Sequence, residues 1–160
     1  MTDKTKLFKQ CMGKFTTGIT VVTTQTETNK LGVTINSFNS VSLNPLLILF
    51  SLKKQSCHYQ HFLQCKNFTV NILSNSQEKY VNLFASHNID TWSHVELDTK
   101  NPITNSPALK NCLAFLECEI YAKYDGGDHT IIVGKVINLI NNENNNPLVY
   151  YRGEFLTYGN

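Results

Sequence analysis

Two short stretches of the chain hold residue types that bind or transform small molecules. The first is GDHT, in which Asp128 and His129 place a carboxylate beside an imidazole at the start of a β-branched stretch. The second is YYRG, Tyr150–Gly153, which puts two aromatic rings, a guanidinium and a flexible glycine in sequence. Each stretch is equally typical of a hairpin or a strand end, so neither decides a function alone.

A third stretch, GVTINSFNSVSLNP at 32–45, is rich in small polar residues between two apolar runs. Hydroxyl and amide groups alternate there with residues typical of a core. Burying such groups without a hydrogen-bond partner costs free energy. Their density therefore predicts a role in holding something polar.

Several familiar catalytic patterns are absent from the sequence. GKFTTGIT lacks the lysine of a phosphate-binding loop and precedes a strand, and no G-x-G-x-x-G or G-x-S-x-G occurs. The 12 acidic residues are dispersed, which gives no basis for a carboxylate pair. CHYQHFLQC contains Cys57, His58, His61 and Cys65, but their spacing is not that of a standard zinc site, so we expect no metal.

Composition narrows the class of protein. The chain has 160 residues, 41% of them hydrophobic, and a formal net charge of +2, which predicts one globular domain over 1–160 without a nucleic-acid-binding face. Its five cysteines are odd in number and irregularly spaced, which favours reduced thiols in the cytoplasm. We find no signal peptide and no apolar run long enough for a membrane helix.

Periodicity predicts mostly strands. We expect strands at 18–25, 31–38, 45–52, 67–74, 112–124, 129–140 and 148–158. We expect helices at 3–15, capped by Thr2 or Asp3, at 54–64, starting near Ser56, and at 76–87, capped by Ser76. DGGD predicts a tight hairpin, NNENNN a polar turn, and 87–108 a long connection typical of functional loops. Strands without βαβ alternation indicate a closed or partly closed antiparallel barrel with short helices.

In order and spacing, seven segments together resemble the flavin reductase family of NAD(P)H:flavin oxidoreductases. They are GKFTTGITVVTT, GVTINSFNSVSLNPLLI, SLKKQSCH, FTVNILS, NLFAS, LECEIYAKYDGGDHTIIVGKV and PLVYYRG. The resemblance runs from about Phe8 to Phe155 and implies a mainly β, antiparallel FMN-binding split barrel of Greek-key type with short flanking helices, usually a homodimer. It implies FMN or FAD, with NADH or NADPH as co-substrate, and a possible monooxygenase partner that receives the reduced flavin.

The resemblance also assigns residues to the site. The flavin-cradling positions are Thr34, Asn36, Ser37, Phe38, Ser40, Val41, Ser42 and Ser51. The phosphate and tail positions are Lys53, Lys54, Gln55 and Ser56, with the start of the next helix offering N–H groups to an anion, and Phe84 and Ala85 contact the flavin. His129 matches the nicotinamide site, and Tyr150, Tyr151, Arg152 and Gly153 match the nicotinamide nucleotide segment.

The chain departs from the usual pattern at Ile35, Asn39, Ser51, Ser86 and His87. A bulkier Ile35 near the ring is expected to alter flavin affinity. The changes at Ser86 and His87 leave the choice between FMN and FAD open.

The expected chemistry is hydride transfer from NAD(P)H to flavin, in which the protein aligns two groups that carry the electrons. This reaction needs no acid–base dyad. The alternatives are a pyridoxamine-phosphate-oxidase-like or heme-degrading enzyme on the same barrel, a non-catalytic flavin-binding module, and a barrel without flavin.

Overall fold

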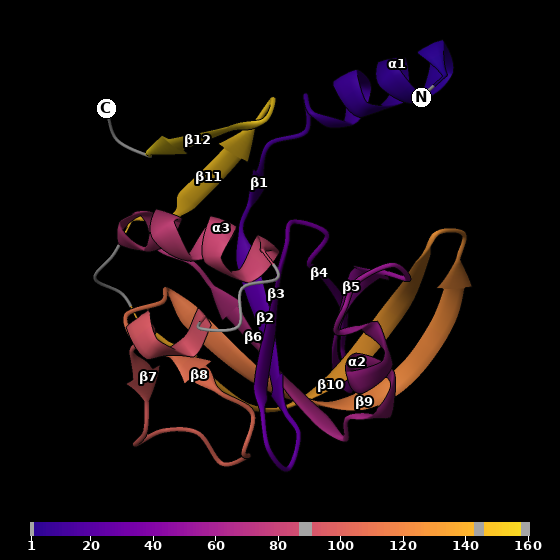
Figure 1. Cartoon of the computed structure of the whole chain (residues 1–160). Helices are drawn as coiled ribbons and strands as arrows, with labels where there is room; N and C mark the ends of the chain where they lie inside the picture. The colour runs from indigo at the N-terminus through magenta and orange to yellow at the C-terminus, as the bar shows by residue number, and fades with distance from the viewer. Residues whose placement is uncertain (1, 87–90, 143–145, 158–160) are drawn as a thin grey trace.

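The computed structural model describes residues 2–86, 91–142 and 146–157. A strongly curved antiparallel sheet forms the body of the molecule, and helices α2 (Tyr59–Gln64) and α3 (Glu78–Ala85) lie against it (Figure 1). The expected mainly β, antiparallel split-barrel architecture is confirmed. No helix within the described ranges is long and apolar enough to span a membrane.

Seven strands build the main sheet in the order β3-β2-β6-β9-β10-β5-β4. Their bounds are β2 Thr20–Gln25, β3 Lys30–Ile35, β4 Asn39–Leu43, β5 Leu46–Lys53, β6 Asn67–Ile72, β9 Ala114–Gly126 and β10 His129–Asn141. The register of β9 against β10 shifts between Val133 and Gly134 and again between Val136 and Asn138. Such irregularities bend a strand and increase its twist, which lets this long hairpin curl around the core.

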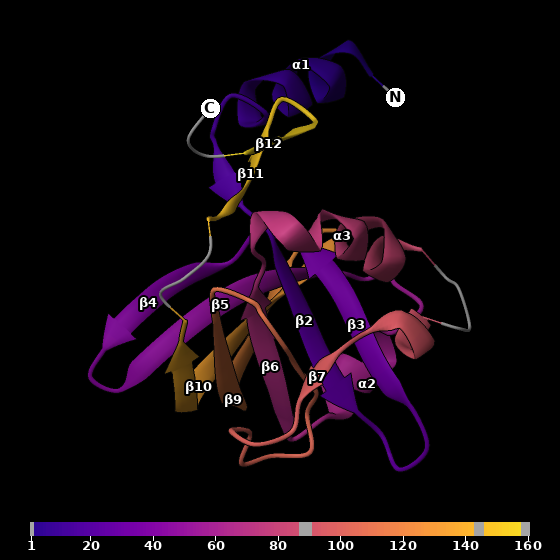
Figure 2. The ribbon, with the colours of Figure 1, turned by 90° about the vertical axis from the view of Figure 1, so that its left-hand side faces the viewer.

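A smaller part of the chain stands apart from the main sheet. Helix α1 (Asp3–Met12) leads into β1 (Thr17–Gly18), which pairs with β11 (Leu148–Tyr151), and β11 pairs with β12 (Glu154–Thr157). Figures 1 and 2 both show α1 and the β11–β12 hairpin projecting beyond the body of the sheet on one side. We call this unit, residues 2–18 and 148–157, the arm.

Helix α1 forms where its cap predicts, but it is not part of the core. The Thr2 side chain accepts a hydrogen bond from the Thr5 N–H at 3.3 Å, which confirms Thr2 as the cap. No residue of α1 is buried, and Leu7 and Phe8 are 60% and 64% exposed. The apolar face that this spacing predicts is therefore not covered by the described residues of the same chain.

The core lies inside the curve of the main sheet. Phe50, Phe62 and Phe68 are fully buried, and the ring centroids of Phe50 and Phe68 lie 5.3 Å apart in an edge-to-face arrangement. A second apolar cluster under helix α3 (Glu78–Ala85) includes Tyr80 and Phe84. In β5, Leu47, Ile48, Phe50 and Leu52 are buried, whereas Leu46 is 44% exposed, so this strand is less completely buried than its continuous apolar run predicts.

Two helix starts differ from the sequence prediction. Helix α2 (Tyr59–Gln64) begins after His58, not at Ser56. The 3₁₀ turn η1 (Asn75–Gln77) precedes α3, and its cap is Ser74, whose backbone N–H donates to the Gln77 side chain at 3.1 Å. Ser74 makes a capping box with Gln77, an arrangement that the expected cap Ser76 does not provide.

Three strand predictions differ from the structure. The expected strand 148–158 is a hairpin of β11 and β12, because the chain turns back at Arg152 and Gly153. The expected strand 18–25 is split, because the chain leaves the sheet of β1 and enters the main sheet at β2. The polar segment after β3 contains β4, an edge strand that we did not predict, since its residues are mostly exposed and carry no alternating core pattern.

The long connection after α3 is tied to the sheet by polar bonds. It contains η2 (Thr91–His94), β7 (Leu97–Asp98) and β8 (Ala108–Leu109). The fully buried Glu117 carboxylate accepts hydrogen bonds from the backbone N–H groups of Ile103 and Thr104 at 2.8 and 2.7 Å and from Asn138 at 2.7 Å. Residues 87–90 and 143–145, which belong to the expected connection and the expected polar turn, lie outside the described residues.

Candidate functional site

A cleft of about 450 Å³ opens between the end of β3, the end of β5, the turn before α2 and the end of α3. His129, the first residue of β10, closes one side. The cleft therefore draws on five elements that the sheet order and the α3 packing bring together.

The cleft has an apolar wall and a polar rim. Val33, Leu52 and Phe84 line it and are at most 8% exposed, so they form a fixed hydrophobic surface. Asn36 and Gln55 line it as well, and within the described part of the chain their side chains make no hydrogen bond. This combination suits a flat, largely apolar group with polar edges.

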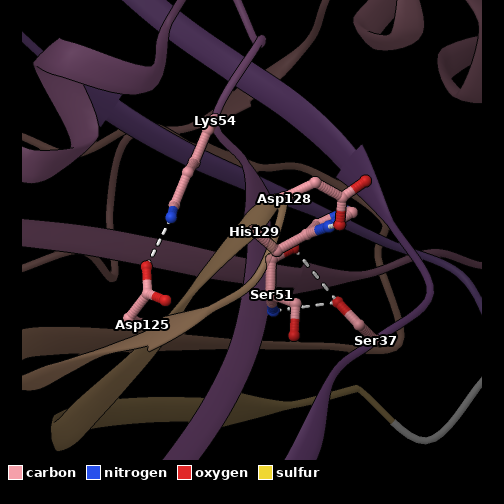
Figure 3. A network of polar contacts seen from close by, with 6 residues as sticks. All are labelled: Ser37, Ser51, Lys54, Asp125, Asp128 and His129. Atoms are coloured by element: carbon pink, nitrogen blue, oxygen red, sulfur yellow. Dashed lines mark hydrogen bonds and ion pairs between the residues drawn. The ribbon is translucent and has the colours of Figure 1, made fainter.

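Several polar side chains at this cleft already have partners in the chain. The Thr34 hydroxyl donates to the Val81 carbonyl at 2.8 Å, which ties β3 to α3. The Ser37 hydroxyl accepts from the Ser51 N–H at 3.0 Å and donates to the Ser51 carbonyl at 3.3 Å (Figure 3).

The Ser37 side chain thus extends the ladder in which Asn39 pairs with Leu49. Thr34 and Ser37 therefore have hydrogen-bond partners within the chain, and their contact with a flavin stays a prediction. Among the described residues, the one buried side-chain polar atom without a partner is the Thr17 hydroxyl, which does not line the cleft.

The mouth of the cleft carries a charged cluster. Lys53 on β5 and His129 on β10 are paired in register, and both line the cleft. The Lys54 ammonium forms an ion pair with Asp125, on the side away from His129 (Figure 3). This hydrogen bond raises the pKa of Lys54 and lowers the pKa of Asp125. Lys54 therefore links the turn after β5 to the β9–β10 hairpin, whereas Lys53 lines the cleft.

Asp128 fixes one nitrogen of His129. Its carboxylate lies 2.7 Å from the His129 Nδ1, and this hydrogen bond, helped by the nearby Lys53 charge, lowers the pKa of Asp128. With the proton on Nδ1, a neutral imidazole presents Nε2 as an acceptor. His129 is thereby oriented at the edge of the cleft by a group outside it.

The structure brings most of the predicted site residues together. Those that line the cleft are Thr34, Asn36, Ser37, Ser51, Lys53, Gln55, Ser56, Phe84, Ala85 and His129. Their assignment to flavin or nicotinamide contacts stays a prediction.

Other predicted residues lie elsewhere. Phe38, Ser40, Val41, Ser42 and Lys54 do not line the cleft; the middle three belong to the edge strand β4, where Val41 is 48% exposed. The predicted N–H donors at the start of α2 are also displaced, because α2 starts at Tyr59 and spans six residues.

The YYRG segment lies on the arm. Tyr150, Arg152 and Gly153 line a second cavity beside α1, and the Arg152 guanidinium carbon lies 5.1 Å from the Tyr151 ring centroid. In one chain the structure therefore does not place this segment at the cleft that contains His129.

Residue-by-residue matching missed some members of the cleft. Val33 and Leu52 are buried strand positions, so the alternation of β3 and the continuous apolar run of β5 were usable signals. Cys57, His58 and Ser86 continue turns that already carried assigned residues. In the described ranges, no three His, Cys, Asp or Glu residues gather as metal ligands.

Comparison with known proteins gives a consistent family. A model of the flavin reductase like domain matches residues 12–159. The reductase component of a flavin-dependent trigonelline monooxygenase from Acinetobacter baylyi is 37% identical over 97% of this chain, which spans 49% of that protein. An FMN reductase (NADH), SmoA, from Agrobacterium fabrum is 36% identical over 96% of this chain and 86% of its own length.

Solved structures agree with the sequence matches. The NADH:FAD oxidoreductase SgcE6 of Streptomyces globisporus, in complex with NAD and FAD fragments, superimposes with a TM-score of 0.91 and 34% identity. The match covers 98% of this chain and 93% of that one. The resemblance read from the seven sequence segments is confirmed, and the chain belongs to the flavin reductase like domain family.

Proposed function

We propose that this protein transfers hydride from NADH or NADPH to FMN or FAD and supplies the reduced flavin to a partner monooxygenase. The observation that carries this function is the cleft itself: an apolar wall, a polar rim and His129 at the mouth, in a member of the flavin reductase like family. The family match across 12–159 supports the prediction of one flavin reductase-like domain.

The cleft fits a flavin ring. Leu52 and Phe84 offer apolar surface to a planar ring, and Asn36 and Gln55 hold amide groups with no hydrogen bond inside the described chain. These amides are suited to the polar edge of the ring and to its tail. Lys53 provides a cation for a phosphate at the mouth.

A bound flavin and a bound nicotinamide together supply the hydride chemistry, and the protein supplies orientation. Phe84 and Leu52 exclude water from the apolar side of the cleft, which protects a reduced group from side reactions. His129, held by Asp128, sets the position of the second substrate through Nε2. Alignment of two reactants is worth several orders of magnitude in rate, so side-chain acid–base chemistry is unnecessary.

A homodimer is part of this proposal. The exposed apolar residues of the arm include Phe8, Met12 and Phe15, which are 64%, 53% and 70% exposed. A second copy packed on this face would bury them. Sedimentation of the wild type and of Phe8→Ser tests the dimer, and a monomeric wild type at micromolar concentration would contradict it.

A cytoplasmic location is likewise proposed. No disulfide joins cysteines in the described part of the chain, which supports a reducing compartment.

The decisive assay follows loss of NADH or NADPH absorbance by the purified protein with FMN, FAD or no flavin. We expect turnover that depends on added flavin, and His129→Ala should raise the KM for the nicotinamide nucleotide or lower kcat. A protein that binds flavin but never consumes either nucleotide would refute the reductase function and leave a binding module. Lys30→Ala, an exposed lysine on β3 outside the cleft, is a matched control and should change neither constant.

A further inference from the structure

A second cavity, of about 610 Å³, lies on the arm between α1 and the turn that joins β11 to β12. We call it the basic groove. Its charged lining residues are Lys6, Lys9, Lys14 and Arg152, and no carboxylate lines it. The residues that line the cleft containing His129 are not part of this lining.

The two walls of the basic groove are joined by direct backbone contact. The Arg152 N–H donates to the Gly13 carbonyl at 2.9 Å, so the end of α1 is tied to the β11–β12 turn. Arg152 has a φ of 52° and Gly153 a φ of 91°. Positive φ at both central residues is what a two-residue hairpin turn requires, so the turn itself fixes the backbone at Arg152. The arginine is therefore placed by the turn and by α1 together.

Helix α1 has two chemically different faces. Lys6, Lys9, Gln10 and Gly13 follow i, i+3, i+4, i+7 spacing, which places them along one face, and all four line the groove. Phe8, Met12 and Phe15 follow the same spacing on another face and are exposed outside it. A homodimer contact on the apolar face leaves the lysine face available.

Positive charge is concentrated at this end of the chain. Residues 1–15 contain four lysines and one aspartate, a net charge of +3, whereas the whole chain has a net charge of +2. None of the ion pairs found among the described residues involves a cation of the basic groove. The groove therefore presents uncompensated positive charge to an incoming ligand.

The groove also has an aromatic wall. Tyr150 lines it and is held by Phe155, with ring centroids 5.7 Å apart. Lysine and arginine donors bind phosphate oxygens, and an aromatic ring stacks on a base. Cations and an aromatic ring in one cavity are the two features that recognise a nucleotide.

We propose that the basic groove binds an adenosine diphosphate group, with Lys6, Lys9 and Arg152 on the phosphates and Tyr150 against the base. The ligand class rests on the proposed function, since NADH, NADPH and FAD all carry this group and FMN does not. Lys6 and Lys9 thereby become binding residues that the family resemblance did not assign.

Calorimetric titration of the full-length protein with ADP tests the site without any turnover. We expect saturable ADP binding that weakens with added salt. Adenosine, which lacks the phosphates, should bind much more weakly than ADP. The double variant Lys6→Gln/Lys9→Gln should weaken ADP binding about tenfold or more, because it removes two charge-assisted contacts. Lys4→Gln is the control: it removes one positive charge from the same helix outside the groove and should leave ADP affinity within about twofold, whereas Lys6→Gln and Lys9→Gln, made singly, should each weaken it more.

Steady-state kinetics identifies which substrate carries the adenosine diphosphate group that binds in the basic groove. With FMN as acceptor, a higher KM for NADH in the double variant assigns the groove to the nicotinamide dinucleotide. A higher KM for FAD with an unchanged KM for FMN assigns it to the flavin dinucleotide. Circular dichroism and the melting temperature of each variant confirm that the fold is retained.

Two results would overturn the proposal: absence of ADP binding by the wild type, or equal losses of affinity in Lys4→Gln and in the double variant. Failure of the reductase function is a separate outcome. ADP binding that depends on Lys6 and Lys9 in a protein without NADH oxidation would support the groove and reject the reductase.

Discussion

Gly32 lies where the core and the proposed flavin cleft meet. It is on β3, and a Cβ added there would stand 2.5 and 2.6 Å from two ring carbons of Phe84. Phe84 is 5% exposed, lines the cleft and makes an edge-to-face contact with Trp92 at 5.1 Å between centroids. The Phe84 ring can therefore sit on the strand only because position 32 has no side chain.

Gly32→Ala should consequently move the Phe84 ring and change both stability and ligand binding. Overpacking of a filled core costs about 1–3 kcal/mol, and the lower part of this range applies if the ring rotates into the cleft. A ring that rotates there occupies space that the flavin needs. We expect the free energy of unfolding to fall by about 1–3 kcal/mol and FMN affinity to fall at least about tenfold.

Two other glycines separate these effects. A Cβ at Gly134 would stand 2.4 Å from Phe68 and 3.0 Å from the Cβ of Cys118, in a part of the core that does not line the cleft. Gly134→Ala should destabilise the fold while FMN affinity per folded molecule stays unchanged. Gly18 has nothing within 4 Å of an added Cβ, so Gly18→Ala should be close to neutral in both measurements.

Urea unfolding and FMN fluorescence titration, performed on the same preparations, give the two numbers for each variant. If Gly32→Ala proved as stable as wild type and bound FMN normally, the close packing of Phe84 on β3 would be wrong. Equal losses of FMN affinity in Gly32→Ala and Gly134→Ala would mean that destabilisation alone weakens binding, and the placement of Phe84 in the flavin site would be refuted.

Three more predictions concern separate parts of the molecule. Burial acts to raise the pKa of the Glu117 carboxyl, but hydrogen bonds to it outweigh burial and lower that pKa. The ionised carboxylate should therefore contribute its full share to the free energy of unfolding above a pH of about 4.3, the pKa of an unfolded glutamate. This contribution should be lost as the pH falls through the lower pKa of the folded state. Glu117→Gln should therefore cost about 1.5–3 kcal/mol at neutral pH and progressively less in acid, which urea unfolding across pH measures, and a pH-independent difference would contradict it. Ser37→Ala removes both hydrogen bonds to the Ser51 backbone and should lower the free energy of unfolding by about 1–2 kcal/mol in the same assay. An unchanged free energy of unfolding would contradict the role of the Ser37 side chain in extending the ladder. Alkylation with iodoacetamide, followed by mass spectrometry, should label exposed Cys57 and spare Cys112, whose pKa burial raises to about 12. Bound FMN should slow the labelling of Cys57, which lines the cleft. Labelling of Cys57 at the same rate with and without FMN would contradict flavin binding in this cleft.

The elements that sequence predicted well are those whose local pattern and tertiary role agree. Most of the apolar run of β5 is buried, and the hairpin between β9 and β10 turns at Gly127, where φ is 74°. Helix α1 formed where its cap and spacing indicated, yet its apolar face is exposed. Periodicity reports that a face is apolar; it does not report whether the same chain covers that face.

The edge strand β4 illustrates a different limit. Its residues are mostly exposed, so no alternation of core and surface marks it, and it forms because β5 offers an unpaired edge. Matching that segment to a family pattern placed Ser40, Val41 and Ser42 beside a flavin, whereas the strand carries them outside the cleft.

Motif order predicts membership in a family more surely than it predicts which residues share one cavity. GDHT and YYRG were interpreted as parts of one nicotinamide site, but His129 borders the cleft while Arg152 faces the lysines of α1. Strand β1 explains the separation, because it pairs with β11 and draws the C-terminal hairpin to the arm instead of the main sheet. That pairing joins residues more than a hundred positions apart, Thr17 with Tyr150, and no local pattern in either segment indicates it. The proposed dimer contact on the apolar face of α1 and the proposed nucleotide in the basic groove are compatible, because they use opposite faces of the same helix.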